Sequence, residues 1–94
     1  MTKRIARRAK QLLTEPEYLE RLEAQDGVCA VPGCGGRPKT RRLHVDHDHK
    51  TGEVRGLLCH LCNRSLPTWM TADRLRNLAA YLDAYTRTRQ DEAR

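Results

Sequence analysis

The sequence lacks the apolar and aromatic residues that a large hydrophobic core requires. Its 94 residues include no Phe and one Trp, and aromatic residues make up 4% of the chain, whereas charged residues make up 32%. A chain of this length forms at most one domain and buries a modest core, so it needs an additional source of stability. We expect one domain over residues 1–94: a basic helical arm at 1–14, a core at 15–68 and a C-terminal helix at 71–87.

Membrane and export segments are also missing. No apolar run approaches the roughly 20 residues of a transmembrane helix. The basic start "MTKRIARRAKQLL" is not followed by the continuous apolar stretch of a secretory signal. We therefore expect no membrane partner and a cytoplasmic protein. In that reducing compartment, cysteines bind metal more often than they form disulfides.

Acidic residues are too few to balance the basic ones. Eighteen Lys and Arg face twelve Asp and Glu, which gives a net charge of +6. Such a balance favours a polyanionic partner, with nucleic acid first. We expect contacts to the nucleic-acid backbone from two basic segments, the arm from Lys3 to Lys10 and the loop from Arg37 to Arg42. The candidate residues for these contacts are Arg7, Arg8, Arg41 and Arg42.

Apolar spacing predicts helices on both sides of the centre. Ile5, Ala9, Leu12 and Leu13 have helical spacing, and "TEPE" starts a second helix with the capping-box pair Thr14 and Glu17. Gly27 is its expected stop. A stripe of Leu75, Leu78, Ala79, Leu82 and Tyr85 predicts a helix over 72–86 with Thr71 as N-cap and a frayed segment after it. The stripe either packs on the core or forms a dimer face, and the sequence does not distinguish the two.

Between these helices the sequence predicts a hairpin and a short helix. "LHV" (43–45) and "EVRGL" (53–57) are typical of strands joined by the turn "DHKTG". "LCHLCNRSL" (58–66) predicts a short helix that ends before Pro67. The fold class is therefore a small α+β fold.

Four cysteines have the spacing of a structural zinc site. Cys29 and Cys34 form one pair, Cys59 and Cys62 form the second, and 24 residues separate the pairs. Four thiolates complete a zinc tetrahedron without an open position, so the ion would stabilise the fold and not catalyse. A redox pair would leave Cys29 and Cys34 without a role, and two disulfides fit poorly with a reducing compartment.

The segment "HVDHDH" (44–49) collects residues suited to metal-assisted phosphodiester hydrolysis. Asp46 and Asn63 offer the oxygen ligands that Mg²⁺ prefers, and an adjacent histidine takes a proton near neutral pH. Simpler interpretations exist for the other polar residues. His44 can bond along the strand, Asp48 can cap the turn, and His60 can be a surface residue between two zinc ligands.

The stretch "HVDHDHKTGEVRGLLCHLCN", preceded by "QDGVC" and the first cysteine pair, closely resembles the phage recombination endonuclease VII family. The resemblance covers roughly residues 17–66 and implies an HNH (His-Me finger) nuclease with a zinc-stabilised ββα-metal core and flanking N- and C-terminal helices. It implies a phage protein acting in a bacterial host on DNA, including branched DNA.

The resemblance also implies a role for each matching residue. Cys29, Cys34, Cys59 and Cys62 would hold zinc. Asp46 and Asn63 would bind a catalytic Mg²⁺ or Mn²⁺, His47 would be the general base, and His49 would assist, with these two roles open to exchange. Arg55 would meet the DNA backbone. Cleavage would leave a 5′-phosphate and a 3′-hydroxyl.

Two departures from the family limit what carries over. The first cysteine pair has a four-residue spacer where the junction resolvase of the family has two, and a knuckle of this size still closes around zinc. The resolvase is also much longer, and its extended helices form an intertwined dimer. Cleavage chemistry therefore carries over better than junction specificity, and a homodimer through the flanking helices is an expectation. A minimal nicking enzyme, a zinc-dependent DNA-binding module without catalysis, and a protein-interaction adaptor are the alternatives.

Overall fold

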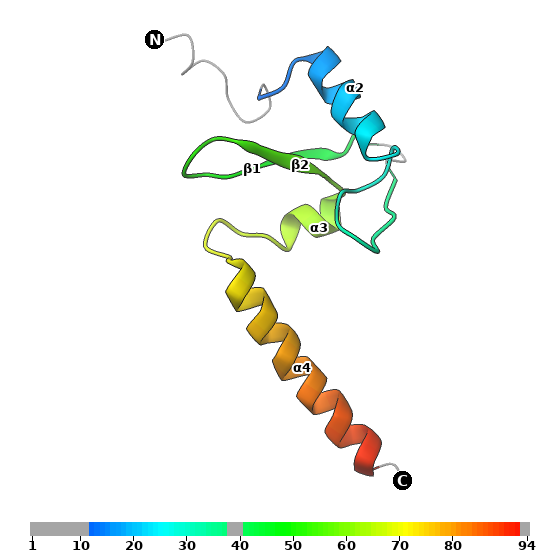
Figure 1. The fold of residues 1–94 in the computed structure, drawn as a ribbon, viewed down its shortest axis with the longest axis vertical. Helices are drawn as coiled ribbons and strands as arrows, with labels where there is room; N and C mark the ends of the chain where they lie inside the picture. Colours follow the sequence, from blue (N-terminus) through cyan, green and yellow to red (C-terminus); the bar gives the residue numbers. More distant parts are fainter. Residues whose placement is uncertain (1–11, 38–40, 93–94) are drawn as a thin grey trace.

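The fold is a small α+β arrangement with the order α2, β1, β2, α3, α4 (Figure 1). It is seen in a computed structural model, which describes residues 12–37 and 41–92. The basic arm Lys3 to Lys10, with Arg7 and Arg8, and the loop residues 38–40 lie outside the described residues. The helix expected from Ile5 to Leu13 therefore lies almost entirely outside them as well.

Helix α2 (Glu15–Ala24) begins where the sequence predicts. Thr14 and Glu17 form a reciprocal capping box, because each side chain bonds the backbone N–H of the other residue. The helix ends before Asp26 and Gly27, which both have positive φ, of 57° and 74°. Gly27 adopts this left-handed conformation at little cost and turns the chain toward the first cysteine pair.

Strands β1 (His44–His47) and β2 (Val54–Leu58) form a two-stranded antiparallel sheet. Val45 faces Leu57 and Asp46 faces Gly56, and a bulge follows between Asp46 and His47. Both strands lie slightly later in the chain than "LHV" and "EVRGL" predicted, since Leu43 precedes β1 and pairing continues through His47. The Asp48 side chain accepts backbone N–H bonds from Lys50 and Thr51, so this residue does cap the turn.

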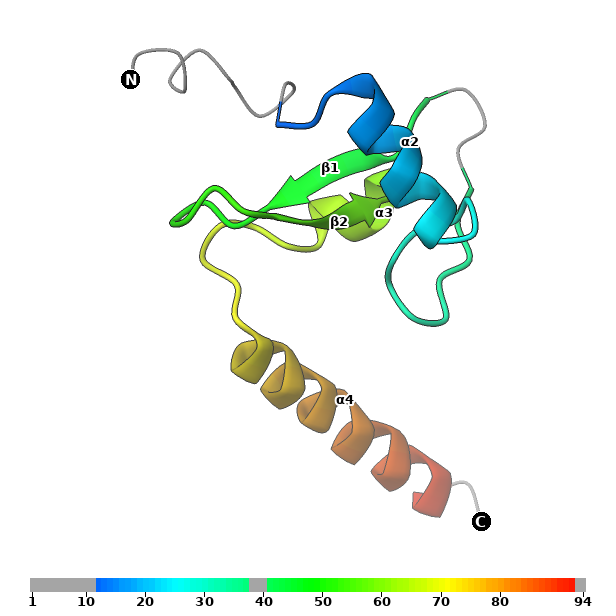
Figure 2. The same cartoon turned by 45° about the horizontal axis from the view of Figure 1, so that its top comes forward.

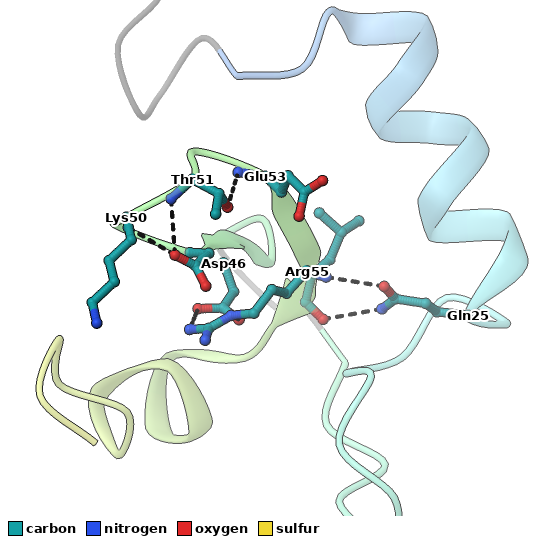
Figure 3. A network of polar contacts seen from close by, with 8 residues as sticks. Gln25, Asp46, Lys50, Thr51, Glu53 and Arg55 are labelled. Carbon is teal, nitrogen blue, oxygen red and sulfur yellow. Dashed lines mark hydrogen bonds and ion pairs between the residues drawn. The ribbon is translucent and has the colours of Figure 1, made fainter. Parts of the chain in front are cut away.

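The core lies between α2 and the hairpin. Tyr18, Leu43 and Leu57 form a buried cluster, and the Tyr18 hydroxyl donates to the Leu43 carbonyl at 3.0 Å. Gln25 extends the sheet with its side chain, because its amide both accepts from the Leu57 N–H and donates to the Leu57 carbonyl (Figure 3). This bidentate contact fixes the end of α2 against β2.

Helix α3 (His60–Arg64) covers the other side of the hairpin, so that the sheet lies between α2 and α3 (Figures 1 and 2). It is shorter than the predicted 58–66, because Cys59 is its N-cap and Ser65 its C-cap. The Cys59 sulfur accepts the N–H of Cys62. The pair Cys59 and Cys62, which the sequence predicts to bind zinc, therefore also defines the start of α3.

Helix α4 (Ala72–Glu92) is longer than expected. Thr71 caps its N-terminus by accepting the Arg74 N–H, as predicted. The prediction that the chain frays after residue 86 is wrong, because the helix continues to Glu92. No Gly or Pro follows Pro67, so nothing in the sequence breaks the helix. In the described part of the chain, no helix combines the length and apolar character needed to cross a membrane.

The position of α4 excludes one of the two interpretations of its apolar stripe. The helix contacts none of the other helices and strands that the structure describes, and it projects from the hairpin (Figure 2). Leu75, Leu78, Leu82 and Tyr85 are between 40% and 59% exposed. The stripe therefore does not pack on the core of its own chain.

Candidate metal centre and catalytic cavity

The four predicted cysteine ligands come together in one cluster. Their sulfur atoms all lie within 4.8 Å of one another, and all four are free thiols. Cys34 Sγ lies 3.7 Å from Cys59 Sγ and 3.6 Å from Cys62 Sγ. Zinc–sulfur bonds of about 2.3 Å place tetrahedral thiolates about 3.8 Å apart. The cluster thus has the donor set and the dimensions of a zinc site.

The local backbone is shaped for this cluster. The Cys29 N–H donates to the Gly36 carbonyl at 2.8 Å, which closes the first knuckle. A Cβ on Gly36 would lie 3.3 Å from Cys34 Sγ and 3.3 Å from Cys59 Cβ. Gly36 therefore leaves the space in which the two knuckles meet.

The thiols of the second pair differ in acidity. The N–H that Cys62 donates to the Cys59 sulfur lowers the pKa of Cys59 to about 7. Partial burial, followed by the neighbouring thiols, raises the pKa of Cys62 to about 12. A hydrogen bond to sulfur thus favours the thiolate, the form that binds zinc, at Cys59.

A cavity of about 470 Å³ gathers all four residues that the sequence proposed for catalysis. It is lined by Asp46, His47, His49 and Asn63, together with His44, Val45 and the segment 66–68. The register shift at Asp46 and His47 lies in β2: Asp46 pairs with Gly56 and His47 with Val54, so Arg55 is the extra residue of the bulge. The His47 and His49 rings lie side by side, with centroids 4.4 Å apart.

The Asp46 carboxylate is held by Arg55. Asp46 is only 8% exposed, and Arg55 donates to both carboxylate oxygens at 2.8 and 2.9 Å (Figure 3). This ion pair raises the pKa of Arg55 above its ordinary value. Sequence reasoning placed Arg55 on the DNA and missed this pairing. The sequence carries no signal for it, because the pairing depends on the hairpin register, in which Asp46 faces Gly56 and Arg55 is the extra residue beside it.

His44 has a more prominent position than the sequence indicated. Its Nε2 is, in the described part of the chain, the only buried side-chain nitrogen or oxygen without a hydrogen-bond partner. The residue lines the same cavity as Asp46 and Asn63, and its ring centroid lies 5.5 Å from that of His60. An unpaired buried polar atom beside a cavity is available to a ligand or to water.

Of the basic residues proposed for DNA, Arg41 and Arg42 are described and exposed. Arg42 donates to both carboxylate oxygens of Glu15 at 3.0 Å and lies 3.9 Å from the centre of the Tyr18 ring. The Arg42 hydrogen bond lowers the pKa of Glu15 and raises that of Arg42. Both Arg41 and Arg42 lie on the loop that precedes β1.

The chain is similar to a known protein family and to phage proteins. The model of the family described as recombination endonuclease VII matches residues 3–84. "Gene 59 protein" of Mycobacterium phage D29 and "Gene 59 protein" of Mycobacterium phage L5 are each 48% identical over 58 residues. The matches cover 61% of this chain and 34% of each relative, so the chain spans about a third of the length of these relatives. No solved structure matches.

Proposed function

Because the chain belongs to the recombination endonuclease VII family, we propose that it is a metal-dependent DNA endonuclease of the HNH, or His-Me finger, type. One observation carries the proposal. Asp46, His47, His49 and Asn63 line one cavity between the hairpin and α3. A zinc-dependent binding module would have no use for this set. The β1–β2–α3 order, with cysteines at the start of α3, supports a zinc-stabilised ββα-metal core.

The four cysteines would hold a structural zinc ion. Their tetrahedral spacing fits it, and the closed ligand set leaves no position for a substrate. Asp46 and Asn63 would hold Mg²⁺ or Mn²⁺, since a carboxylate and an amide are the oxygen donors that these ions prefer. When bound, such an ion supplies positive charge against the phosphate in the transition state.

The remaining side chains would carry the proton transfer and the positioning. His47 takes a proton from a water molecule, whose oxygen attacks phosphorus as the bond to the 3′-oxygen breaks. The products are a 5′-phosphate and a 3′-hydroxyl. His49, whose ring lies beside that of His47 at a tilt of 38°, assists at the phosphate or exchanges roles with His47. Arg55, Arg41, Arg42 and the arm residues Arg7 and Arg8 contact the DNA backbone.

The family supports the substrate class, and the exposed helix α4 bears on how many chains act on one DNA. We propose DNA, including branched DNA, cut by a phage protein in the cytoplasm of its bacterial host. One catalytic cavity per chain cuts one strand at a time. A homodimer through the exposed stripe of α4 would bring two cavities to one DNA. A monomer would instead act as a nicking enzyme.

A substrate panel tests this function. The zinc-loaded protein is incubated with a four-way junction, a flap and a linear duplex, each with Mg²⁺, with Mn²⁺ and with EDTA. We expect cleavage of at least the junction or the flap in Mg²⁺ or Mn²⁺, with 3′-hydroxyl ends and no cleavage in EDTA. Binding without cleavage of any substrate in either ion would favour the DNA-binding module instead.

A further inference from the structure

The single tryptophan of the chain is exposed beside the catalytic cavity. Trp69 is 64% exposed in a protein that contains no Phe. It lies in the segment that joins α3 to α4, in a turn closed by the Met70 N–H and the Pro67 carbonyl. Exposing so large an aromatic ring costs free energy unless a ligand or a partner covers it.

Trp69 belongs to a second cavity, of about 340 Å³, that adjoins the first. The two share His49 and residues 66–68, so they form neighbouring parts of one depression. Both views of the fold place the segment after α3 below the tip of the hairpin (Figures 1 and 2). A group that stacked on Trp69 would therefore lie next to the phosphate that His47 and His49 serve.

The charges around Trp69 identify the kind of ligand. Lys50 and Arg55 line the same cavity from the hairpin together with Asp48, whose carboxylate accepts backbone N–H bonds from Lys50 and Thr51. In Figure 3 the Lys50 side chain points away from the turn, whereas Arg55 is directed at Asp46. Arg74 lies with its guanidinium carbon 5.6 Å from the centre of the Trp69 ring. An aromatic face flanked by cations fits a nucleotide, whose base stacks and whose phosphate is anionic.

The base must be unpaired. Both faces of a base inside a regular duplex are covered by its neighbours, so Trp69 reaches it only if the base leaves the stack. We propose that Trp69 stacks on an unpaired nucleobase beside the scissile phosphate, with Lys50 and Arg55 on its phosphates. The protein thereby selects DNA that has unpaired nucleotides over perfectly paired duplex. That the phosphate beside this base is the one cut rests on the proposed nuclease function. The stacking itself does not depend on cleavage.

Because the chain contains one Trp, its fluorescence reports on this site directly. The zinc-loaded full chain is titrated, without Mg²⁺ or Mn²⁺, with three DNAs of equal length and base composition: a flap, a single strand and a perfect duplex. We expect the flap and the single strand to quench the Trp69 emission through stacking and the duplex to leave it unchanged. Equal quenching by all three, or quenching by none, would overturn the proposal.

Variants then test whether the ring selects the substrate. Trp69→Leu should weaken flap binding by about 5- to 150-fold, the usual range for loss of one base stack, with duplex affinity changed less than about twofold. Trp69→Phe should keep part of the preference. Tyr81→Leu, which removes an aromatic ring that is 73% exposed on α4, is the matched control. Zinc content and circular dichroism verify that each variant is folded.

The outcomes separate this inference from the proposed function. Flap-selective quenching without cleavage of any DNA in Mg²⁺ would support the stacking site and reject the nuclease. Cleavage in Mg²⁺ with the wild-type ratio of flap to duplex in both Trp69 variants would support the nuclease and reject the stacking site. Retention of that ratio in Trp69→Leu alone overturns the proposal, since no aromatic face would then be needed.

Discussion

The Asp46 carboxylate has two possible cationic partners, the Arg55 guanidinium and a divalent metal ion. In the structure Arg55 occupies both of its carboxylate oxygens, whereas the proposed function assigns the same oxygens to Mg²⁺ or Mn²⁺. A metal ion must therefore share the carboxylate with Arg55 or displace it. Displacement would free the Arg55 guanidinium to bind a DNA phosphate. Asp46 could then bind the metal ion while Arg55 contacts the DNA.

Arg55→Gln should consequently bind the divalent ion more tightly while it cuts DNA more slowly. An ion pair with a half-exposed Arg is worth up to roughly 1 kcal/mol, so Mn²⁺ affinity should rise about fivefold. Electron paramagnetic resonance of free Mn²⁺ measures this in the zinc-loaded protein. Arg76→Gln, which removes the exposed partner of Asp73 on α4, is the control. Weaker Mn²⁺ binding in Arg55→Gln would show that Arg55 supports the metal site instead of competing with it.

His47→Ala should abolish cleavage and leave binding intact. Loss of a general base lowers the rate by about 10²- to 10⁴-fold, while zinc content and DNA affinity should stay near wild type, because His47 touches neither the cysteine cluster nor the core. Single-turnover cleavage measures the rate, and a gel-shift assay measures affinity. His49→Ala is made in parallel, since a larger loss there would exchange the two roles. Wild-type cleavage by His47→Ala would remove it from the mechanism.

Single residues were predictable where their chemistry restricts them to one role. Four cysteines in two spaced pairs have few uses outside metal binding, and they do form one cluster. Asp46, His47, His49 and Asn63 were predicted from the family pattern and do line one cavity. The Asp46–Arg55 pair and the unpaired His44 nitrogen were not foreseen, because they depend on the hairpin register and on rotamers.

Between elements, the structure joins α2 to the loop before β1 through Glu15 and Arg42. The hydrogen bond from Arg42 depresses the pKa of Glu15 below its ordinary value of 4.5. A carboxyl with a depressed pKa in the folded state stabilises the fold above its unfolded pKa. That stabilisation disappears as the pH falls through the folded pKa.

Glu15→Gln should therefore lower the melting temperature slightly from pH 8 to about pH 5, and the difference from wild type should shrink below that. Because both residues are exposed, the effect is small and decreases with added salt. Differential scanning fluorimetry of both proteins measures it, and their common zinc site cancels in the comparison. Glu20→Gln, elsewhere on α2, is the control. A difference that grew toward acid pH would contradict the assignment.

The two cysteine knuckles connect the end of α2 to the start of α3, so zinc should decide whether these elements assemble. Structural zinc contributes roughly 10–16 kcal/mol, which exceeds or equals the total stability of most small domains. Cys59→Ser removes one thiolate but keeps a side-chain oxygen that can cap the start of α3, so its effect reports on the metal site. We expect this variant to be unfolded by circular dichroism and to lack zinc by mass spectrometry. A folded, metal-free Cys59→Ser protein would refute the structural zinc.

His60→Ala is the matched control for the zinc experiment. His60 lies between Cys59 and Cys62 in the sequence and is exposed, so it should be replaceable with zinc and fold retained. Loss of zinc in this variant would mean that the ligand set is not made of the four cysteines alone.

Elements were predictable where a start signal stands next to a periodic pattern. The capping box of α2 and the Thr71 cap of α4 are of this kind, and both helices begin as expected. Their ends were harder to predict. Helix α4 continues to Glu92 because no breaker follows the stripe, whereas a frayed segment was expected after residue 86. The bulge at Asp46 and His47 leaves no sequence signal, because it arises from the pairing of two strands.

At the scale of the molecule, α4 makes the shape elongated, and its exposed apolar stripe raises the question of what covers it. The extents are 61 × 28 × 20 Å, and the long dimension reflects a helix of about 31 Å that stands apart from the rest. Most of the stability of a protein helix comes from packing of its apolar face, which α4 does not obtain from its own chain. Its stripe Leu75, Leu78, Leu82, Tyr85 has the 3–4–3 spacing of a coiled-coil seam. Pairing with a second copy would bury the stripe.

We therefore expect the protein to be a dimer in solution, with about twice the 10.8 kDa mass of one chain by size-exclusion chromatography with light scattering. The double variant Leu78→Glu with Leu82→Glu should be a monomer, because two charges per chain would face each other across the seam, and its helix content should fall as α4 loses its partner. Its zinc content should not change, since α4 contacts none of α2, β1, β2 and α3. Ala80→Glu, on the opposite side of α4, should leave the dimer intact. If wild type is a monomer with α4 fully helical, the stripe serves another partner, and each chain then nicks DNA alone.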